Sequence, residues 1–243
     1  VIETIAIEYQ AEMTWRASLI GTLDRVPANL FRRFATELRL DADYRGSVGI
    51  GWSPIVPRGE IGSFERLVSR ETDTQFKVAP LPSQNSNFAV PVTFFEPMKD
   101  MNRRAIGFNM YAEPHRREAM QEAIRTGRPT ATGPIDLVQD RNARKGFIVY
   151  MPVFEPETRG EMIRGFVYSP FNSQDFLDSV LTREVVGSRG VRLYDGDPVP
   201  ANLIASHAPE KLTGNVTRLE VQLADRPMTV EVESARGDAL SLL

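Results

Sequence analysis

The chain has 243 residues, of which 42% are hydrophobic and 25% charged, and its formal net charge is −3. This composition is ordinary for a globular protein, and the balance of charge gives no sign of a nucleic-acid surface or a polybasic membrane patch. The absence of cysteine excludes disulfides, thiolate metal sites and a cysteine nucleophile. No run of about 18 apolar residues occurs, so the sequence predicts no transmembrane helix within these 243 residues.

Residues 1–45 are expected to form a long N-terminal stalk helix of roughly 35–40 Å before a restart at Pro27. Its apolar stripe at helical spacing comprises Ile2, Ile5, Tyr9, Met13, Ile20 and Leu23. The stripe fits either a helix packed on its own domain or a stalk that pairs with a second copy. Because the segment is long and stands before any partner element, we expect the stalk and a homodimer formed through it.

Residues 46–112 alternate short apolar runs with turns rich in proline and glycine. Strands are expected at residues 47–55, 74–78, 88–95 and 105–110, and Pro91 indicates an edge or bulge position in the third. A short helix is expected at residues 60–70, with Phe64, Leu67 and Val68 facing inward.

The stretch of residues 105–154 changes period several times. Glu113-Pro114 indicates a helix start, because proline is tolerated at the first helical position and a carboxylate is favoured at the positive end of the dipole. Gly127 ends that helix. An extended segment at 135–138, a polar loop at 140–146 and a strand buried on both faces at 146–154 follow. This order of strand, helix and antiparallel strands is typical of a small α+β sensory unit of the PAS type.

The last third of the chain predicts a second unit. A strand at residues 162–168 precedes a helix that Asn172 or Ser173 can cap, and a further strand is expected at 191–194. Apolar and polar residues alternate along 217–223, turn at 224–227 and alternate back along 228–232. That pattern predicts an antiparallel hairpin with one buried face.

The central stretch resembles the characteristic motif of CHASE domains, which are the extracytoplasmic sensory regions of histidine kinases and nucleotide cyclases. The resemblance lies in GFNMYAEPHRREAMQEAIRTGRPTATGPIDLVQD (107–140) followed by GFIVYMPVF (146–154). Further pieces follow in the expected order, namely GIGWSPIVPRGEIGSFERLV (49–68), PVTFFEP (91–97) and RGFVYSPFNSQDFLDSVL (164–181). The ordered set covers the chain from about residue 31 to the C-terminal strands.

The resemblance implies an α+β architecture in which the stalk helix is followed by two tandem PAS-like domains with antiparallel sheets. Residues 1–45 would be the stalk, 46–161 the membrane-distal ligand-binding domain, 162–235 the membrane-proximal domain and 236–243 a juxtamembrane tail. It also implies the periplasmic sensor region of an inner-membrane receptor, such as a histidine kinase or a cyclic-dinucleotide cyclase or phosphodiesterase, with transmembrane helices on both sides of this chain.

The residues of the chain predict no catalysis, no metal and no cofactor. The two histidines, His115 and His207, belong to no metal-ligand spacing, and no GxSxG elbow occurs. The glycines at 46, 49 and 51 have the wrong spacing for a phosphate-binding loop and lead into Trp52-Ser-Pro rather than a helix. A hydrolase or transferase is therefore disfavoured.

A small-molecule pocket is better supported, since such pockets are mostly apolar with a few convergent polar groups. The distal unit supplies both kinds of residue: Phe88, Phe94, Phe108 and Phe166 are aromatic, and Asn109, Thr132 and Tyr150 are polar. We expect Asn109 and Tyr150 to face one cavity. The alternative is a dimerisation or signal-transmission module that binds no ligand and whose pocket is filled by its own side chains.

The plant cytokinin receptors share this domain, but this sequence has different residues at the positions that contact the ligand in those receptors. The acid after their central strand corresponds to Asn109, and the threonine of their last strand corresponds to Tyr150. The glycines that open their pocket correspond to Tyr168 and Ser169, which are bulkier. The resemblance therefore implies the pocket's position and not an adenine-type ligand.

Overall fold

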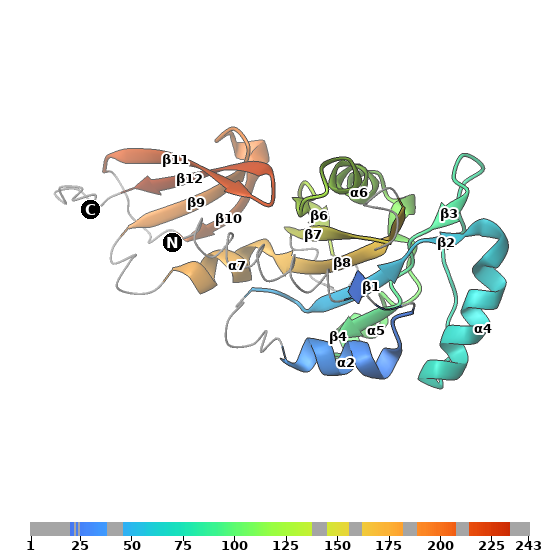
Figure 1. Cartoon of the computed structure of the whole chain (residues 1–243). Coiled ribbons are helices and arrows are strands. Elements are labelled where there is room, and N and C mark those ends of the chain that lie inside the picture. The colour runs from blue at the N-terminus through green and yellow to red at the C-terminus, as the bar shows by residue number, and fades with distance from the viewer. Residues whose placement is uncertain are drawn as a thin grey trace.

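The computed structural model describes residues 20–21, 23, 25–37, 46–137, 145–155, 162–181, 189–207 and 214–233. Two antiparallel sheets form two lobes joined through the helix α7 (Figure 1). The residues expected to form most of the stalk, 1–19, and the expected tail, 236–243, lie outside the described part of the chain.

The larger sheet has the strand order β4-β1-β8-β7-β5, with β6 also paired to β7. Its strands are β1 (Ile50–Pro54), β4 (Phe94–Glu96), β5 (Thr130–Ala131), β6 (Ile135–Asp136), β7 (Lys145–Phe154) and β8 (Ile163–Asn172). The strands β7 and β8 have ten residues each and are buried along almost their whole length. Both are therefore covered on both faces, as the apolar run at 146–154 predicts.

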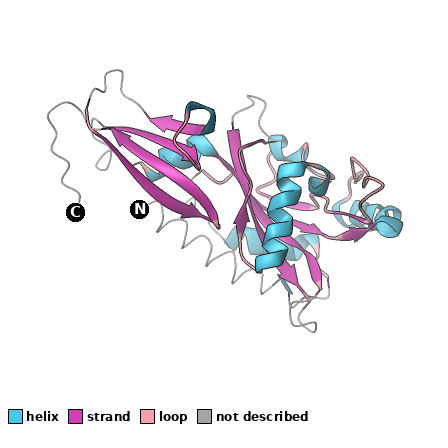
Figure 2. Ribbon diagram, turned by 90° about the horizontal axis from the view of Figure 1, so that it is seen from above, coloured by secondary structure: helices cyan, strands magenta, loops and turns pink. Residues whose placement is uncertain are grey.

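Strand alternation sorts the side chains of this sheet onto two faces. Tyr150 lies opposite Tyr168, Tyr168 opposite Gly51, and Phe166 opposite Ser53. These residues share one face, which we call the α6 face because α6 (Pro114–Thr126) packs over it (Figure 2). The other face carries Trp52, Val167 and Phe94, and α2 (Ala28–Glu37) covers it.

The distal end of the large lobe is built from short elements. The two-stranded sheet of β2 (Val56–Pro57) and β3 (Phe88–Ala89) lies next to η1 (Arg58–Glu60) and α4 (Ile61–Thr72) (Figure 1). The segments α5 (Asp100–Arg103) and η2 (Met110–Ala112) connect β4 to α6.

The smaller sheet has the strand order β10-β9-β12-β11. Its elements are β9 (Gly190–Asp195), η4 (Pro200–Asn202), β10 (Leu203–His207), β11 (Val216–Leu223) and β12 (Arg226–Glu233). The helix α7 (Ser173–Val180) begins directly after β8 and packs beside β10. The side chain of Gln174 donates to the Ser206 carbonyl at 3.0 Å and accepts from the Ser206 amide at 3.1 Å.

The predicted fold class is confirmed: the chain is α+β with antiparallel sheets, and the expected helices at α2, α4, α6 and α7 and the C-terminal hairpin are present. Asn172 caps α7, as predicted. Because β8 pairs with β1 and β7, however, the first sheet extends to residue 172. The division between the two lobes therefore falls at α7 rather than at residue 161.

Several local predictions differ from the structure. Residues 74–78 and 105–110 form no strand; only isolated bridges join Ala79 to Phe108 and Pro91 to Asn109. The second segment turns because Gly107 has φ +83° and its neighbours make turn hydrogen bonds. The strand expected at 88–95 is interrupted around Pro91 and leaves β3 and β4 on either side.

One side-chain prediction is wrong, and one strand was not predicted. Leu67 is 42% exposed instead of facing inward. The sequence pattern did not indicate the strand β10, which ends at His207. Neither Leu67 nor His207 belongs to the buried aromatic cluster described below.

Gly107 provides a test of this turn. A Cβ at Gly107 would lie 1.9 Å from the Lys77 carbonyl oxygen, whereas at Gly127, which has φ +67°, a Cβ would meet nothing within 4 Å. We expect Gly127→Ala to cost about 1–2 kcal/mol for its left-handed backbone. Gly107→Ala should cost about 1–3 kcal/mol more, because the clash adds to the same backbone cost. Chemical denaturation of both variants measures the difference, and equal losses would contradict the packing described here.

Candidate functional site

The N-terminus of α6 is fixed above the large sheet by a side-chain cap. The Glu113 carboxylate accepts from the amides of His115 at 3.1 Å and Arg116 at 2.9 Å, with Pro114 at the first helical position. Arg116, Ala119, Met120 and Ala123 are buried. Their spacing of three, four and seven residues puts them on one side of the helix, facing the sheet. Arg116 is therefore the one cation on the buried side of α6.

Aromatic rings fill the α6 face. Tyr150 meets Phe166 edge-on with ring centroids 5.8 Å apart, and its centroid lies 6.0 Å from that of Tyr168. Phe95 extends the cluster, with its centroid 6.0 Å from that of Tyr168. Met110 and Met120 belong to the same buried cluster and close it from the helical side.

Polar groups on this face lack partners. The Tyr168 hydroxyl, the Ser53 hydroxyl and the Arg116 Nε are buried and make no hydrogen bond of normal geometry. The Tyr150 hydroxyl donates only to the Met110 Sδ, at 3.3 Å, and thioether sulfur is a weak acceptor. Among the described residues, the α6 face thus combines an apolar frame with several unused donors.

Both tyrosines on this face stay protonated. Burial raises the pKa of Tyr150 and of Tyr168 well above the usual value, and the proximity of Tyr150 raises the pKa of Tyr168 further. The nearby Ser53 hydroxyl lowers the pKa of Tyr168, and the positive charge of Arg116 lowers the pKa of both tyrosines, but burial outweighs these effects. Their hydroxyls therefore remain hydrogen-bond donors over the whole physiological pH range.

The predicted site residues divide between several places. Tyr150, Phe166 and Tyr168 lie together on the α6 face, as their register requires. Phe108 and Phe88 are partly buried beside the same cluster. Phe94 points to the opposite face of the sheet, where its ring centroid lies 6.0 Å from that of Phe31.

Asn109 and Thr132 are buried, but their side chains bind the protein's own backbone. The Asn109 Oδ1 accepts from the Val90 amide at 3.0 Å, and its Nδ2 donates to the Pro80 carbonyl at 3.1 Å. The Thr132 Oγ1 accepts from the Ile148 amide at 3.0 Å. These two residues hold the loops and strand around the cluster in place.

The sequence interpretation missed Ser53 and Arg116. Strand alternation from Trp52 would have put Ser53 on the face that Gly51 occupies. Helical spacing from Ala119 and Met120 would have put Arg116 on the buried side of its helix. Strand alternation and helical spacing could therefore have indicated both residues, although an arginine in the first turn of a helix is usually solvated.

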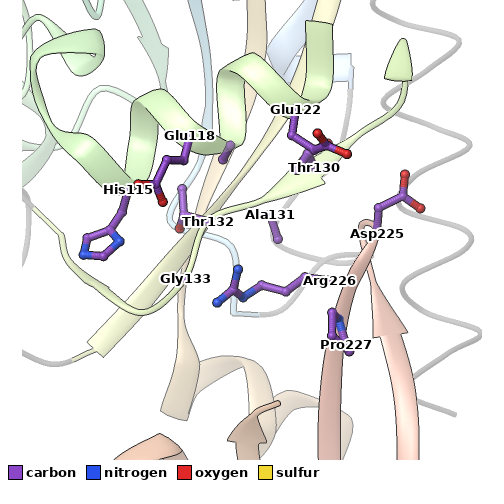
Figure 3. A pocket seen from close by; sticks show the side chains of 11 residues that line it. His115, Glu118, Glu122, Thr130, Ala131, Thr132, Gly133, Asp225, Arg226 and Pro227 are labelled. Carbon is purple, nitrogen blue, oxygen red and sulfur yellow. The ribbon is translucent and has the colours of Figure 1, made fainter. Parts of the chain in front are cut away.

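A cleft lies where the two lobes meet (Figure 3). Its volume is about 240 Å³, and it lies between α6, β5 and the turn that joins β11 to β12. Polar residues of both lobes line it, namely His115, Glu118, Glu122, Asp225 and Arg226. Arg226 is paired with Asp195, and its Nη2 lies 2.7 Å from the Asp195 Oδ2. Thr132 also lines this cleft.

The described residues contain no group of three or more side chains that could hold a metal ion. None of the helices they form is long and apolar enough to cross a membrane. The α6 face is the candidate functional site because it combines buried aromatic rings with donors that lack a hydrogen bond of normal geometry.

The chain thus combines an aromatic sheet face, closed by one capped helix, with a second antiparallel sheet. The family model of the CHASE domain matches residues 24–205, and the chain belongs to the CHASE family. The resemblance of the sequence motifs is thereby confirmed. The chain is thus a sensory domain of the kind that signalling receptors carry.

Solved structures show the same fold. An extracellular ligand binding receptor from Desulfohalobium retbaense has 12% sequence identity and a TM-score of 0.52, over 96% of this chain and 39% of that chain. A methyl-accepting chemotaxis protein X has 14% identity and a TM-score of 0.53, over 97% of this chain and 92% of that chain. The chain thus spans less than half of the length of the first. No curated protein matches the sequence.

The placement of Asn109 generates a stability prediction. Asn109→Ala removes the partners of a buried amide and of the Pro80 carbonyl, so we expect the free energy of unfolding to fall by about 1–3 kcal/mol. Asn29→Ala is the matched control, because the Asn29 side chain is exposed and bonds only its neighbour's amide; it should change stability by less than about 0.5 kcal/mol. Urea denaturation compares the two, and an unchanged Asn109→Ala variant would contradict the assigned role.

Proposed function

We propose that this chain is the periplasmic sensory part of an inner-membrane receptor. We also propose that a small molecule binds between the helix α6 and the sheet face that this helix covers, the α6 face. The full-length protein would be a sensor histidine kinase or a cyclic-dinucleotide cyclase or phosphodiesterase, with transmembrane helices on both sides of this chain. It would act as a homodimer through the N-terminal helix. The large lobe would be the membrane-distal one.

The single observation that supports the binding site is the set of buried donors without partners on the α6 face. The side chains of most buried polar residues in folded proteins find a partner, and a buried hydroxyl left unpaired costs about 1–3 kcal/mol. Tyr168 is 1% exposed and Ser53 0%, and they lie on neighbouring strands of one face. The two hydroxyls lie near enough to each other for Ser53 to lower the pKa of Tyr168, but they form no hydrogen bond of normal geometry. A ligand with acceptor atoms would give both donors a partner, which supports a binding site here.

Signalling requires more than binding. A ligand shifts a conformational equilibrium only by its difference in affinity for the two states. The strands that carry the two tyrosines lead out of the large lobe: β8, with Tyr168, continues into α7, and β7, with Tyr150, pairs with β5 at the cleft between the lobes. Occupancy of the α6 face would therefore act on the connection to the smaller sheet.

One observation favours a second candidate, a transmission module that binds no ligand. A Cβ at Gly51 would lie 2.2 Å from the Tyr168 Cζ, so the tyrosine ring occupies the space directly above the glycine. In this alternative the ring and its neighbours fill the pocket of the family, and the lobe only carries a signal between other parts of the receptor.

Tyr168→Phe separates the two candidates. Loss of an unpaired hydroxyl should leave the melting temperature of the ligand-free protein unchanged or raise it. If the site binds a ligand, a metabolite that raises the melting temperature of the parent should bind the variant about tenfold more weakly. The control is Tyr194→Phe, the same deletion in the smaller sheet, which should keep the ligand shift. A broad metabolite library that shifts neither the parent nor the control supports the transmission module.

The proposed dimer predicts the behaviour of variants in the N-terminal segment. Ile5→Asp should lower the dimer fraction in sedimentation velocity, because it puts a charge on the apolar stripe. Ile20 is unsuitable for this test, since it is 3% exposed within the domain core and its replacement would destabilise the fold.

A truncation provides the second arm. Removal of residues 1–19 keeps Gly21, whose carbonyl accepts from the Arg164 Nη1 at 3.1 Å, so the domain should stay folded. Unchanged self-association of this truncated chain would contradict dimerisation through the helix.

A further inference from the structure

We infer that the ligand of the α6 face carries a carboxylate on an apolar body, and that Arg116 is the residue that recognises it. The inference rests on the proposed function, since it assigns a chemical class to the ligand of that same site. Four features of the described residues support it: an incompletely compensated buried charge, donors that converge beside it, the end of a helix dipole, and the ring that orients the guanidinium.

The first feature is the charge balance around Arg116, whose side chain is 5% exposed. The Glu113 Oε2 lies 3.7 Å from the Arg116 Nε, beyond hydrogen-bond distance, and its carboxylate already accepts two backbone amides of the cap. The other carboxylate nearby, that of Asp136, is paired with the Lys145 Nζ at 2.9 Å, and Asp136 offers Arg116 only its carbonyl, at 3.3 Å. The guanidinium is therefore buried without a carboxylate bonded to it among the described residues.

A guanidinium has five N–H donors and no acceptor. Taking such a cation out of water is costly unless hydrogen bonds and an opposite charge compensate it. Its Nε has no partner, which leaves part of that requirement unmet in the protein alone. An anion is the species that would meet it.

The second feature is the position of the tyrosine hydroxyls. Arg116 lowers the pKa of both Tyr150 and Tyr168 against the larger rise from burial, so its charge lies within electrostatic reach of both hydroxyls. Both hydroxyls are protonated donors: that of Tyr150 bonds only the Met110 Sδ, and that of Tyr168 lies near the Ser53 hydroxyl, which lowers the pKa of Tyr168, without a hydrogen bond of normal geometry. A cation and two neutral donors in one buried region favour an acceptor-only group, and an ionised carboxylate accepts through both of its oxygens.

The third feature is that Arg116 lies in the first turn of α6, a helix of 13 residues. The N-terminal end of a helix carries a positive partial charge that attracts anions.

The fourth feature is that the Arg116 Cζ lies 5.0 Å from the centroid of the Phe108 ring. Such stacking fixes the plane of the guanidinium, which can then offer two parallel donors to a carboxylate.

The body of the ligand follows from the rest of the face. Tyr150, Phe166 and Met110 are buried and offer rings and a thioether rather than further charges. Arg116 disfavours a cationic ligand, and a neutral ligand would leave the charge of Arg116 with only the partial compensation that Glu113 gives at 3.7 Å. The chemistry of the site thus points to a monocarboxylate with an aromatic or branched apolar body.

The first test needs no variant. Matched pairs of carboxylate and carboxamide, such as phenylacetate with phenylacetamide and indole-3-acetate with indole-3-acetamide, within a library of such pairs on aromatic and aliphatic bodies, are compared by thermal melting of the parent. We expect a carboxylate to raise the melting temperature and its amide to have little effect. An amide that matches its carboxylate overturns the carboxylate assignment but leaves a small-molecule site.

The second test uses neighbouring arginines. Arg116→Gln should weaken binding of the active carboxylate about ten- to hundredfold, because hydrogen bonds to charged groups carry that discrimination. Arg117→Gln makes the same charge change one residue on, where the Arg117 Nη1 donates to the Tyr111 carbonyl at 3.1 Å, and should retain binding. Arg116→Lys keeps the charge without the planar fork and should show an intermediate loss.

Equal affinity of Arg116→Gln and the parent would overturn the role of Arg116. If no pair shifts the parent, the carboxylate inference fails, and the broad library with Tyr168→Phe decides separately whether the site binds any ligand. If Arg116→Gln does not fold, the carboxylate and amide comparison in the parent and the Arg116→Lys variant still decide the question.

Discussion

The pairing of β8 with β1 on one side and β7 on the other is the constraint on which the rest of the structure depends. From Gly165 to Asn172 every position of β8 is buried, so both faces of the strand must be covered. One face requires α6, and the other requires α2 and the aromatic residues around Phe31. The backbone must also approach closely, since a Cβ at Gly165 would lie 2.4 Å from the Ser53 carbonyl oxygen. The site and its opposite face are thus consequences of one doubly covered strand.

Much of this architecture could be predicted from local chemistry. Glu113-Pro114 and Gly127 bound α6 because a cap, an imino acid and a left-handed glycine each act within one helical turn. The hairpin of β11 and β12 could also be predicted, because the alternation of apolar and polar residues and the turn lie within a few residues of each other. The pairing of strands far apart in the sequence could not be predicted. The alternation of side chains along a strand shows which residues share a face, but it does not show which other strand pairs with that strand. The assignment of β8 to the wrong lobe and of Phe94 to the wrong face both follow from that limit.

The candidate site shows the same division between local and long-range information. The sequence pattern pointed to Asn109 because it is polar and precedes a helix, yet its amide is held by the backbone of two loops 19 and 29 residues away. The sequence shows that Tyr168 is bulkier than the glycine of the plant receptors. It does not show that the Tyr168 hydroxyl makes no hydrogen bond of normal geometry, because that depends on how β1, with Ser53, and α6 pack around it. Whether a buried polar atom is satisfied is a property of the assembled fold, so it can be found only once the partners are placed.

The tyrosines of the site lie on the two strands that connect most directly to the smaller lobe. At the end of β8, the Asn172 side chain caps α7, and Gln174 in the first turn of α7 exchanges two hydrogen bonds with Ser206 of β10. From β7, the residue opposite Tyr150 is Thr130, and the next residue, Ala131, donates its amide to the Ala224 carbonyl in the β11–β12 turn at 3.0 Å. A close-packed strand pair transmits displacement instead of absorbing it. A ligand that moves α6 away from the sheet would therefore displace both connections to the smaller sheet, the one through α7 and the one through β5. The smaller sheet would then change its position relative to the large lobe.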